Sequence, residues 1–353
     1  MPALVRSAPA TVSKRGAAGE NLRKSLLKWF DLNGRSLPWR VRGGRAHPYH
    51  VWLSEVMLQQ TTTAAVGPYF RKFVERWPDV RALSVAPRDD VLEAWAGLGY
   101  YSRARHLHAA ATILARDGFP RDEAGWRQLP GVGAYTAAAV AAIAFDEATN
   151  VVDGNVERVI ARLRGVATPL PDARPKLRAL AGELVRDDRP GDWAQALMDL
   201  GATICTPKSP RCGACPWMAN CAAHASGAPG TFPRRHAKAV RPERFGVAFR
   251  IERDGLLWLV RRPDGGLLGG MAGLPTTEWR GEKWERAQAL KQAPVKANWK
   301  HAGAVRHVFT HFALTLDVYT GEAAPKGGGW WGNANALPTV FKKAAGCWSN
   351  GND

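Results

Sequence analysis

Four cysteines in the second half of the chain have spacings that suit metal binding. The chain has five cysteines; Cys347 stands alone, and the other four are Cys205, Cys212, Cys215 and Cys221. A secreted disulfide framework would spread its pairs over the fold, so this clustering favours a metal or cluster site. Four thiolates at such spacing can hold a tetrahedral zinc ion or an iron–sulfur cluster. Because only Cys212 and Cys215 form the short unit typical of zinc sites, the wider gaps favour a cluster.

Two carboxyl groups occur in sequence contexts that favour opposite protonation states. Glu55 shares a helical face with Val51 and Leu58, and burial there would favour the neutral acid. Asp153 precedes an apolar helical pattern, the position of a helix N-cap, where the helix dipole favours the carboxylate anion. A neutral acid and an anion are the pair that cleaves glycosidic bonds. The simpler interpretations are a solvated helical glutamate and an aspartate that only caps its helix.

A glycine pair separates two helical stretches in residues 129–136, which read LPGVGAYT. Gly131 and Gly133 allow a tight hairpin whose backbone N–H groups, at the start of the next helix, would bind phosphate without reading sequence. Many helix–turn–helix corners use glycine, so the motif alone does not establish a phosphate site. The chain's charge supports one, because 49 Lys and Arg residues against 31 Asp and Glu residues give a formal net charge of +18. Such an excess predicts a polyanionic partner, most simply nucleic acid.

Helices must position these residues. From Leu22 to about residue 224, apolar residues recur at helical spacing, as at Leu22, Leu26 and Phe30. A length of 353 residues suggests two domains. Residues 1–20 predict a disordered basic leader and residues 21–224 a helical domain. Residues 225–243, rich in Gly, Pro and Arg, predict a basic linker.

After the linker the periodicity changes to that of β-strands. Residues 245–251 and 256–262 predict two strands joined by a turn at Asp254 and Gly255. Residues 305–319 predict a strand pair or one long bent strand, and residues 338–345 a closing helix. Residues 244–345 therefore predict a small α+β domain, with residues 346–353 as a tail.

No segment has the length and apolarity of a membrane-spanning helix. The most apolar stretch, residues 135–145, is mostly alanine and much shorter than the roughly 20 residues that a span needs. The N-terminus carries basic residues but no apolar core of the length that a secretory signal requires. We therefore expect a soluble cytoplasmic protein that has no membrane partner.

Together these segments resemble the helix–hairpin–helix, iron–sulfur DNA glycosylases, and most closely the adenine DNA glycosylases, which remove adenine mispaired with 8-oxoguanine. The resemblance is dense over about residues 21–224, where many independent motifs agree in order and spacing. They are the cysteine set and residues 37–40 (LPWR), 54–61 (SEVMLQQT), 97–105 (GLGYYSRAR), 129–136, 152–156 (VDGNV) and 195–201 (QALMDLG). The resemblance implies a mainly α helix–hairpin–helix glycosylase domain whose four cysteines bind a [4Fe–4S] cluster.

The resemblance also implies catalytic roles for four residues. Glu55 would protonate N7 of adenine and make the base a better leaving group. Asp153 would stabilise the oxocarbenium ion at C1′. Asn155 and Tyr135 would hydrogen-bond these carboxyl groups and fix their geometry.

A second group of residues would contact DNA and the extruded base. Tyr100 and Gln60 would wedge into the base stack beside the opposite base once adenine is flipped out. Arg40 and Gln195 would line the base pocket. The other implied contacts are Thr61, Leu98, Gly131 and Gly133.

One position separates this family from its relatives of the endonuclease III type. Those proteins carry a lysine two residues after the second hairpin glycine, and its amine forms a Schiff base that leads to strand cutting. Here that residue is Tyr135, which has no amine. The resemblance therefore implies a monofunctional glycosylase.

The second domain resembles the Nudix-like module of the same family at residues 259–262, 268–275 and 307–312. A Nudix hydrolase gathers Mg²⁺ with several carboxylates on an REx2EExG-like helix, whereas the carboxylates of residues 276–300 are Glu278, Glu282 and Glu285, at other spacings. We therefore expect a module that recognises the mispair and hydrolyses no pyrophosphate. The contacts to the opposite base would come from Phe309, Thr310, where family members usually carry serine, and His311. Phe309 and Phe312 could also be core residues of a strand.

The sequence thus predicts a monomeric, monofunctional DNA glycosylase that starts base excision repair in a bacterium. Its partner would be double-stranded DNA with A:8-oxoguanine or A:G mispairs, which would place the bound protein at the nucleoid. One alternative is a bifunctional glycosylase/lyase for oxidised pyrimidines, against which Tyr135 and the second domain argue. Another is a non-catalytic DNA-binding protein with a structural metal, which leaves the pair Glu55 and Asp153 without explanation.

Overall fold

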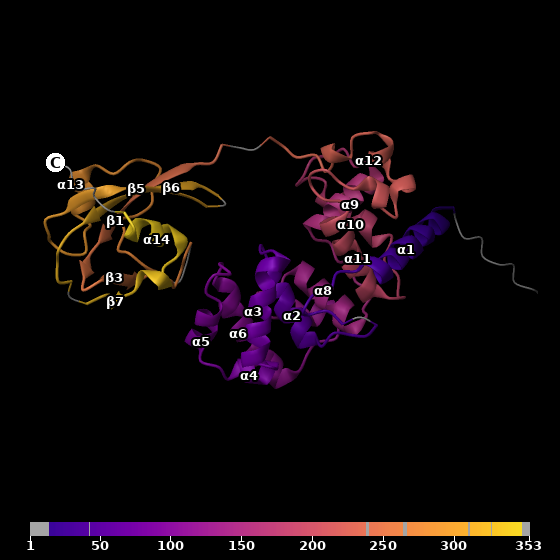
Figure 1. The fold of residues 1–353 in the computed structure, drawn as a ribbon, viewed down its shortest axis with the longest axis horizontal. Coiled ribbons are helices and arrows are strands. Elements are labelled where there is room, and N and C mark those ends of the chain that lie inside the picture. Colours follow the sequence, from indigo (N-terminus) through magenta and orange to yellow (C-terminus); the bar gives the residue numbers. More distant parts are fainter. Residues whose placement is uncertain are drawn as a thin grey trace, which may run out of the picture. The chain divides into compact units, whose positions relative to one another are not determined.

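A computed structural model describes residues 14–41, 43–237, 240–263, 267–309, 311–325 and 327–347. The chain divides into two compact units, residues 1–237 and residues 238–353 (Figure 1). Unit 1 is helical, and the strands of the described residues all lie in unit 2. The predicted fold class, a mainly α first domain and an α+β second domain, is confirmed.

The helices of unit 1 form two groups, with α2 to α6 on one side and α1 with α9 to α12 on the other (Figure 1). No helix in the described part of the chain is long and apolar enough to cross a membrane. The bounds are α1 (Lys14–Asn33), α2 (Pro48–Leu58), α3 (Thr63–Arg76), α4 (Val80–Ser84), α5 (Arg88–Ala94), α6 (Ser102–Asp117), α7 (Glu123–Trp126), α8 (Ala134–Phe145), α9 (Gly154–Arg164), α10 (Arg174–Gly182), α11 (Pro190–Thr203) and α12 (Ala222–Ala225). Short 3₁₀ turns are η1 (Cys212–Ala214), η2 (Met218–Asn220) and η3 (Pro229–Thr231).

Each group of helices has its own hydrophobic core. One core is built around α2, α3, α6 and α8, and the other around α1, α9, α10 and α11. Helix α8 lies between them, and its buried alanines at 137–142 let both α2 and α11 pack closely against it. The consequence for the site is that α2, α8, α9 and α11 converge on one region.

Unit 2 contains two small sheets. In the first, with the order β1-β6-β5, β1 (Glu243–Arg250) runs parallel to β6 (Ala313–Thr320) and β5 (Lys300–Val308) runs antiparallel to β6. In the second, β3 (Leu256–Arg261) pairs antiparallel with β2 (Glu252–Arg253), β4 (Ala272–Gly273) and β7 (Trp330–Gly332). The remaining elements are α13 (Arg286–Leu290), η4 (Ala334–Ala336) and α14 (Thr339–Ala345). Phe341 of α14 is fully buried in a core to which both sheets contribute.

The strand predictions for unit 2 are largely confirmed, with one difference in pairing. Asp254 and Gly255 form the predicted turn, both with positive φ (51° and 75°). The turn joins β2 to β3, however, and β1 pairs with β6 in the other sheet. The backbone N–H of Trp258 still donates to the carbonyl of Ile251 at 2.9 Å, so residues 243–253 form one extended run whose two parts pair with different partners. Residues 305–319 form part of two strands and not one bent strand.

The expected leader and linker contain more structure than their composition indicates. Helix α1 begins at Lys14, inside the predicted leader. In the predicted linker, the carbonyl of Phe232 accepts from Arg162 Nε at 3.0 Å and the carbonyl of Arg234 accepts from the N–H of Leu170 at 2.8 Å. The first half of the predicted linker is therefore part of unit 1, hydrogen-bonded to α9 and to the loop after it through backbone contacts that composition does not reveal.

Candidate active site

A cavity of about 490 Å³ lies where α2, α8, α9 and α11 converge in unit 1. It brings together all four residues predicted to be catalytic, which come from three helices and a helix cap. It also collects four of the predicted DNA or base contacts. The predicted residues on its wall are Arg40, Glu55, Gln60, Thr61, Tyr135, Asp153, Asn155 and Gln195.

Glu55 is a buried acid on this wall. It lies on α2, whose residues 49 and 51–57 are buried, and only 5% of Glu55 is exposed. Burial raises its pKa to about 7; nearby Asp153 also raises it, while a hydrogen bond from Tyr135 and the charge of Arg40 lower it. Its Oε2 atom has no hydrogen-bond partner among the described residues. The structure therefore provides a carboxyl group that can carry a proton at neutral pH.

Asp153 is the N-cap of α9, as predicted. Its Oδ1 accepts from the N–H of Val156 at 2.7 Å, and its Oδ2 accepts from Asn155 Nδ2 at 2.7 Å. Both oxygens thus receive hydrogen bonds, and the carboxyl group lies at the positive end of a helix dipole. Asn155 is itself oriented, because Arg158 Nη2 donates to its Oδ1 at 2.8 Å.

Tyr135 lies in the first turn of α8 and lines the same cavity as the two carboxyl groups. Its hydroxyl is 3.2 Å from Met198 Sδ and supplies the hydrogen bond that lowers the pKa of Glu55. Burial, together with the neighbouring Glu55 and Asp153, raises the pKa of the Tyr135 hydroxyl. Tyr135 is therefore a proton-bearing donor to the site, and it carries no nucleophilic nitrogen.

Asp199 holds two arginines at the cavity wall and was not among the predicted site residues. It is fully buried on α11, where Arg40 donates to its two oxygens at 2.7 and 2.9 Å and Arg35 Nε donates at 2.6 Å. Burial alone would raise the pKa of Asp199, but the hydrogen bonds and charges of Arg40 and Arg35 outweigh it, and the pKa is lowered. The available signal was a carboxylate directly between apolar residues of a helix (Met198 and Leu200), which requires a cationic partner when buried.

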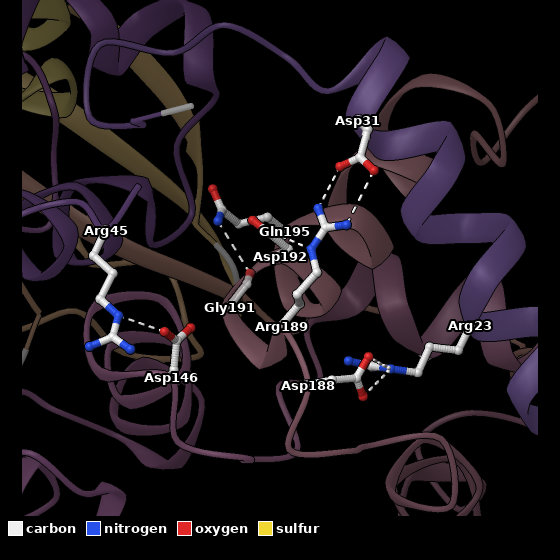
Figure 2. Close-up of polar contacts among 9 residues, drawn as sticks. All are labelled: Arg23, Asp31, Arg45, Asp146, Asp188, Arg189, Gly191, Asp192 and Gln195. Atoms are coloured by element: carbon white, nitrogen blue, oxygen red, sulfur yellow. Dashed lines mark hydrogen bonds and ion pairs between the residues drawn. The ribbon is translucent and has the colours of Figure 1, made fainter. Parts of the chain in front are cut away.

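Gln195 stands between this cavity and a second, polar one of about 310 Å³. Its Nε2 donates to the carbonyl of Gly191 at 3.2 Å. Figure 2 shows the ion pairs around the second cavity, Arg45 with Asp146 and Arg189 with Asp31 and Asp192. Gln195 therefore forms a wall of the candidate base pocket, which agrees with the predicted position.

Four predicted DNA contacts of unit 1 lie outside the cavity. Leu98 is buried in the hydrophobic core, so its side chain packs inside the protein. Tyr100 is 51% exposed and has a positive φ of 49°. Gly131 has a φ of 74° and approaches His106 so closely that a Cβ would lie 2.6 Å from His106 Cβ. Gly133 caps α8 with open space around it, so the glycines form the predicted hairpin between α7 and α8 with exposed backbone.

The four clustered cysteines line one small apolar cavity, together with Arg162 and Ile204. Arg162 Nη1 lies 3.2 Å from Cys205 Sγ, and Cys221 Sγ lies 3.4 Å from the Arg162 carbonyl. Among the described residues, no three His, Cys, Asp or Glu side chains are close enough together to hold a single metal ion. Four thiols around one cavity fit the donor set of an iron–sulfur cluster, which when bound ties this loop to α9.

In unit 2 the predicted recognition residues follow β5. Phe309 stacks on Trp279 with ring centroids 5.9 Å apart and an interplanar angle of 22°. Phe312 is buried, so the interpretation of one of these rings as core is confirmed, and His311 is exposed. Thr310 lies outside the described residues.

Three segments of the chain match known protein families. Residues 53–185 match the HhH-GPD superfamily base excision DNA repair proteins, and residues 205–221 match the iron–sulfur binding domain of endonuclease III. Residues 246–345 match the NUDIX domain. Fold and site therefore define a helix–hairpin–helix enzyme of base excision DNA repair, and the predicted [4Fe–4S] cofactor is confirmed.

Several known relatives are adenine DNA glycosylases. The protein from Rattus norvegicus is 37% identical over 359 residues, covering 84% of this chain and 70% of the relative. The protein from Mus musculus is 36% identical over 394 residues, with 91% and 76% covered. The protein from Mycolicibacterium smegmatis is 43% identical over 214 residues, with 60% and 72% covered. The chain belongs to the adenine DNA glycosylase family.

Solved structures agree with this assignment for unit 1. The structure of a thermostable thymine-DNA glycosylase matches with a TM-score of 0.54 and 28% identity, covering 60% of this chain and 99% of the other. An endonuclease III–DNA complex matches with a TM-score of 0.50, 21% identity and coverage of 62% and 99%. The second likeness shows a shared fold. The protein therefore belongs to the glycosylases of base excision repair, which act on DNA, and this agrees with the predicted enzyme class.

Proposed function

We propose that this protein hydrolyses the N-glycosyl bond of adenine mispaired with 8-oxoguanine or guanine and leaves an intact strand with an abasic site. The observation that carries this proposal is the pair of carboxyl groups in one cavity. Glu55 is buried with its pKa raised to about 7, and Asp153 accepts two hydrogen bonds at a helix N-terminus. Glu55 is thus prepared to give a proton, and Asp153 lies at the positive end of a helix dipole, where it can face a developing positive charge.

The proposed chemistry follows from these two states. Adenine is flipped out of the duplex into the cavity, since its glycosidic bond is inaccessible inside the stack. Glu55 gives its proton to N7, and the C1′–N9 bond breaks with its electron pair leaving on the base. Asp153 stabilises the positive charge that develops on the sugar at C1′. Water then adds its oxygen to C1′ and releases a proton, which completes the hydrolysis.

The other cavity residues have positioning roles in this proposal. Asn155 and Tyr135 hold the two carboxyl groups, with Asn155 donating to Asp153 at 2.7 Å. Arg40 and Gln195 line the pocket for the base. Tyr100, Gln60 and Thr61 meet the DNA at the mouth of the pocket, and the backbone of Gly131 and Gly133 holds a phosphate. Leu98 supports this surface from the core.

The two domains divide the work in the same proposal. Residues 21–224 carry the chemistry and the cluster, and residues 244–345 recognise the opposite base through Phe309, Thr310 and His311. The carboxylates of residues 276–300 do not have the spacing of a Nudix metal-binding helix, which supports a role for this domain in recognising the mispair. We propose a monomer that works in the bacterial cytoplasm on nucleoid DNA, where its net charge of +18 favours binding to phosphate.

The decisive experiment is single-turnover excision from duplexes with adenine opposite 8-oxoguanine, guanine or thymine. The first two should lose adenine, and the strand should stay intact until treated with alkali. Borohydride should trap no covalent adduct, because Tyr135 offers no amine. Efficient strand cutting without alkali would favour the glycosylase/lyase alternative, and no release from any duplex would refute the proposal. Glu55→Gln and Asp153→Asn serve as matched controls that should bind the mispair and release almost no adenine.

A further inference from the structure

Arg103 is a buried cation whose hydrogen bonds go mainly to backbone carbonyls, with one long contact of 3.5 Å from Nη2 to the Thr61 hydroxyl. It lies in the first turn of α6 with 7% of its surface exposed. Its guanidinium donates to five backbone carbonyls at 2.7–3.0 Å, those of Val56, Met57, Gln59, Leu98 and Gly99. No carboxylate of the described residues forms an ion pair with it, so the carbonyls supply most of the compensation for its charge.

The five carbonyls belong to two loops that are far apart in sequence. Those of Val56, Met57 and Gln59 are at the C-terminus of α2, where helix carbonyls lack intrahelical partners. Those of Leu98 and Gly99 are in the loop between α5 and α6. One side chain therefore ties the end of α2 to the α5–α6 loop.

Each loop carries a non-glycine residue with left-handed backbone directly after an anchored carbonyl. Gln60 has a φ of 57° and follows Gln59; Tyr100 has a φ of 49° and follows Gly99. Such residues persist only where the surroundings hold them. Both side chains are exposed, and Gln60 lies at the rim of the cavity that holds Glu55. The strained pair thus faces outward beside the pocket.

We propose that Arg103 is a positioning residue for base flipping, which holds Gln60 and Tyr100 as one rigid wedge beside the pocket. The inference rests on the proposed function and adds a residue that touches neither the base nor the DNA. The wedge is formed before DNA arrives, so inserting it costs no ordering of the two loops. The guanidinium carbon also lies 5.6 Å from the Tyr100 ring centroid and 5.2 Å from that of Trp95. The cation–π contact with the Tyr100 ring helps to hold that ring in place.

Lysine should not replace Arg103. The planar guanidinium presents five N–H groups in a fixed fork, whereas an ammonium is a point charge with three donors and cannot reach carbonyls of two loops at once. Arg103→Lys therefore keeps the charge and removes the link. Arg116→Lys is the matched control, because Arg116 lies on the same helix with its side chain 74% exposed.

The test measures flipping and excision separately in the full-length protein. Flipping is followed by the fluorescence of 2-aminopurine placed beside a non-cleavable 2′-fluoro adenine opposite 8-oxoguanine, and excision by single-turnover kinetics on the normal substrate. Arg103→Lys should reduce the fluorescence change and slow excision roughly 10- to 100-fold, since a misplacement of about 1 Å can cost about 100-fold. The pH at which the rate falls should not move, because Glu55 is untouched. Arg116→Lys should match the native protein in both measurements.

A merely structural role is distinguished by repeating the substitution in a Gln60→Ala, Tyr100→Ala background. If Arg103 acts through the wedge, Arg103→Lys should slow excision less than about twofold there, because both substitutions remove the same function. An equal loss in both backgrounds would overturn the proposal. The proposal for Arg103 would also be overturned if the Arg103→Lys variant flipped and excised adenine as fast as the native protein does. That result would leave the proposed function intact, because the native protein would still release adenine.

Trp95→Phe keeps the proposal falsifiable if Arg103→Lys does not fold. Trp95 Nε1 donates to the same Gly99 carbonyl at 3.0 Å, and phenylalanine keeps a ring beneath the guanidinium while removing that donor. A smaller loss of flipping in the same direction is expected. Unchanged flipping in this variant would contradict the proposal that hydrogen bonds to the Gly99 carbonyl position Tyr100.

Discussion

Arg40 and Asp199 form a two-pronged ion pair at the wall of the candidate active site. Arg40 Nη1 donates to Asp199 Oδ2 at 2.7 Å and Nη2 donates to Oδ1 at 2.9 Å, while Arg35 adds two contacts, from Nε at 2.6 Å and from its backbone N–H at 2.9 Å. The pair couples stability to catalysis. The charge of Arg40 lowers the pKa of Glu55, and Asp199 fixes where that charge lies.

Asp199→Asn is therefore expected to destabilise the protein strongly. It leaves the buried guanidinium of Arg40 and the partly buried one of Arg35 without a counter-charge, and breaking a buried pair in this way costs about 3–5 kcal/mol. Denaturant unfolding at neutral pH measures the change. Asp192→Asn on the same helix is the control, because its ion pair with Arg189 is exposed (Figure 2) and should contribute less than about 1 kcal/mol. Equal effects of the two variants would contradict the role given to Asp199.

The rate of adenine release should fall as pH rises through about 7. Glu55 must carry its proton to act as an acid, and its pKa is raised to about 7 by burial. Single-turnover rates from about pH 5 to about pH 9 measure this profile. Tyr135→Phe removes the hydrogen bond that lowers the pKa of Glu55, so its midpoint should move to higher pH. A profile without a decrease above pH 7 would remove Glu55 as the proton donor.

The same pKa shift predicts how Glu55 affects stability. Its pKa rises from 4.5 in the unfolded chain to about 7 in the fold, so its favourable contribution is fully present below pH 4.5 and is lost as pH rises through 7. Glu55→Gln should match the native protein near pH 4.5 and exceed it above pH 7 by an amount on the order of 3 kcal/mol. Urea unfolding at both pH values measures the difference. A stability gain that does not depend on pH would point to packing as its cause.

Sequence patterns predicted the helices, caps and turns of this protein better than the contacts between residues that are far apart in the chain. The N-cap role of Asp153, the glycine hairpin and the closing helix α14 each depend on neighbours in the chain, and all three are confirmed. Asp199, Arg103 and Arg158 were missed because each has partners 40 or more residues away in the chain, and no local spacing marks such pairs. The burial of Leu98 is likewise a property of the assembled helices.

The cluster loop yields a prediction about metal content. Anaerobically purified protein should contain about four iron atoms and no stoichiometric zinc. Arg162 is fully buried and donates to Cys205 Sγ and to the carbonyls of Thr206, Pro207 and Phe232, so Arg162→Gln should lose iron faster under air. The exposed Arg164 on the same helix gives the control variant Arg164→Gln, which should keep its iron. One zinc per chain without iron would refute the cluster.

Removing unit 2 should reduce discrimination between mispairs without stopping excision. A chain that ends at Ala237 keeps both carboxyl groups, the hairpin, the cysteines and the backbone contacts of Phe232 and Arg234, whereas one that ends at Ala228 loses those contacts and should be less stable. In the longer truncation, the preference for A:8-oxoguanine over A:G should be about 1–3 kcal/mol smaller than in the full chain, which is the amount that one good base contact contributes. Single-turnover rates on both duplexes at one salt concentration measure the preference, because a loss of phosphate contacts weakens binding to both alike. Full-length Phe309→Ala with His311→Ala should reproduce the reduced preference. If the truncation binds both duplexes less tightly but discriminates as well as the full chain, unit 2 is an electrostatic clamp and does not read the opposite base.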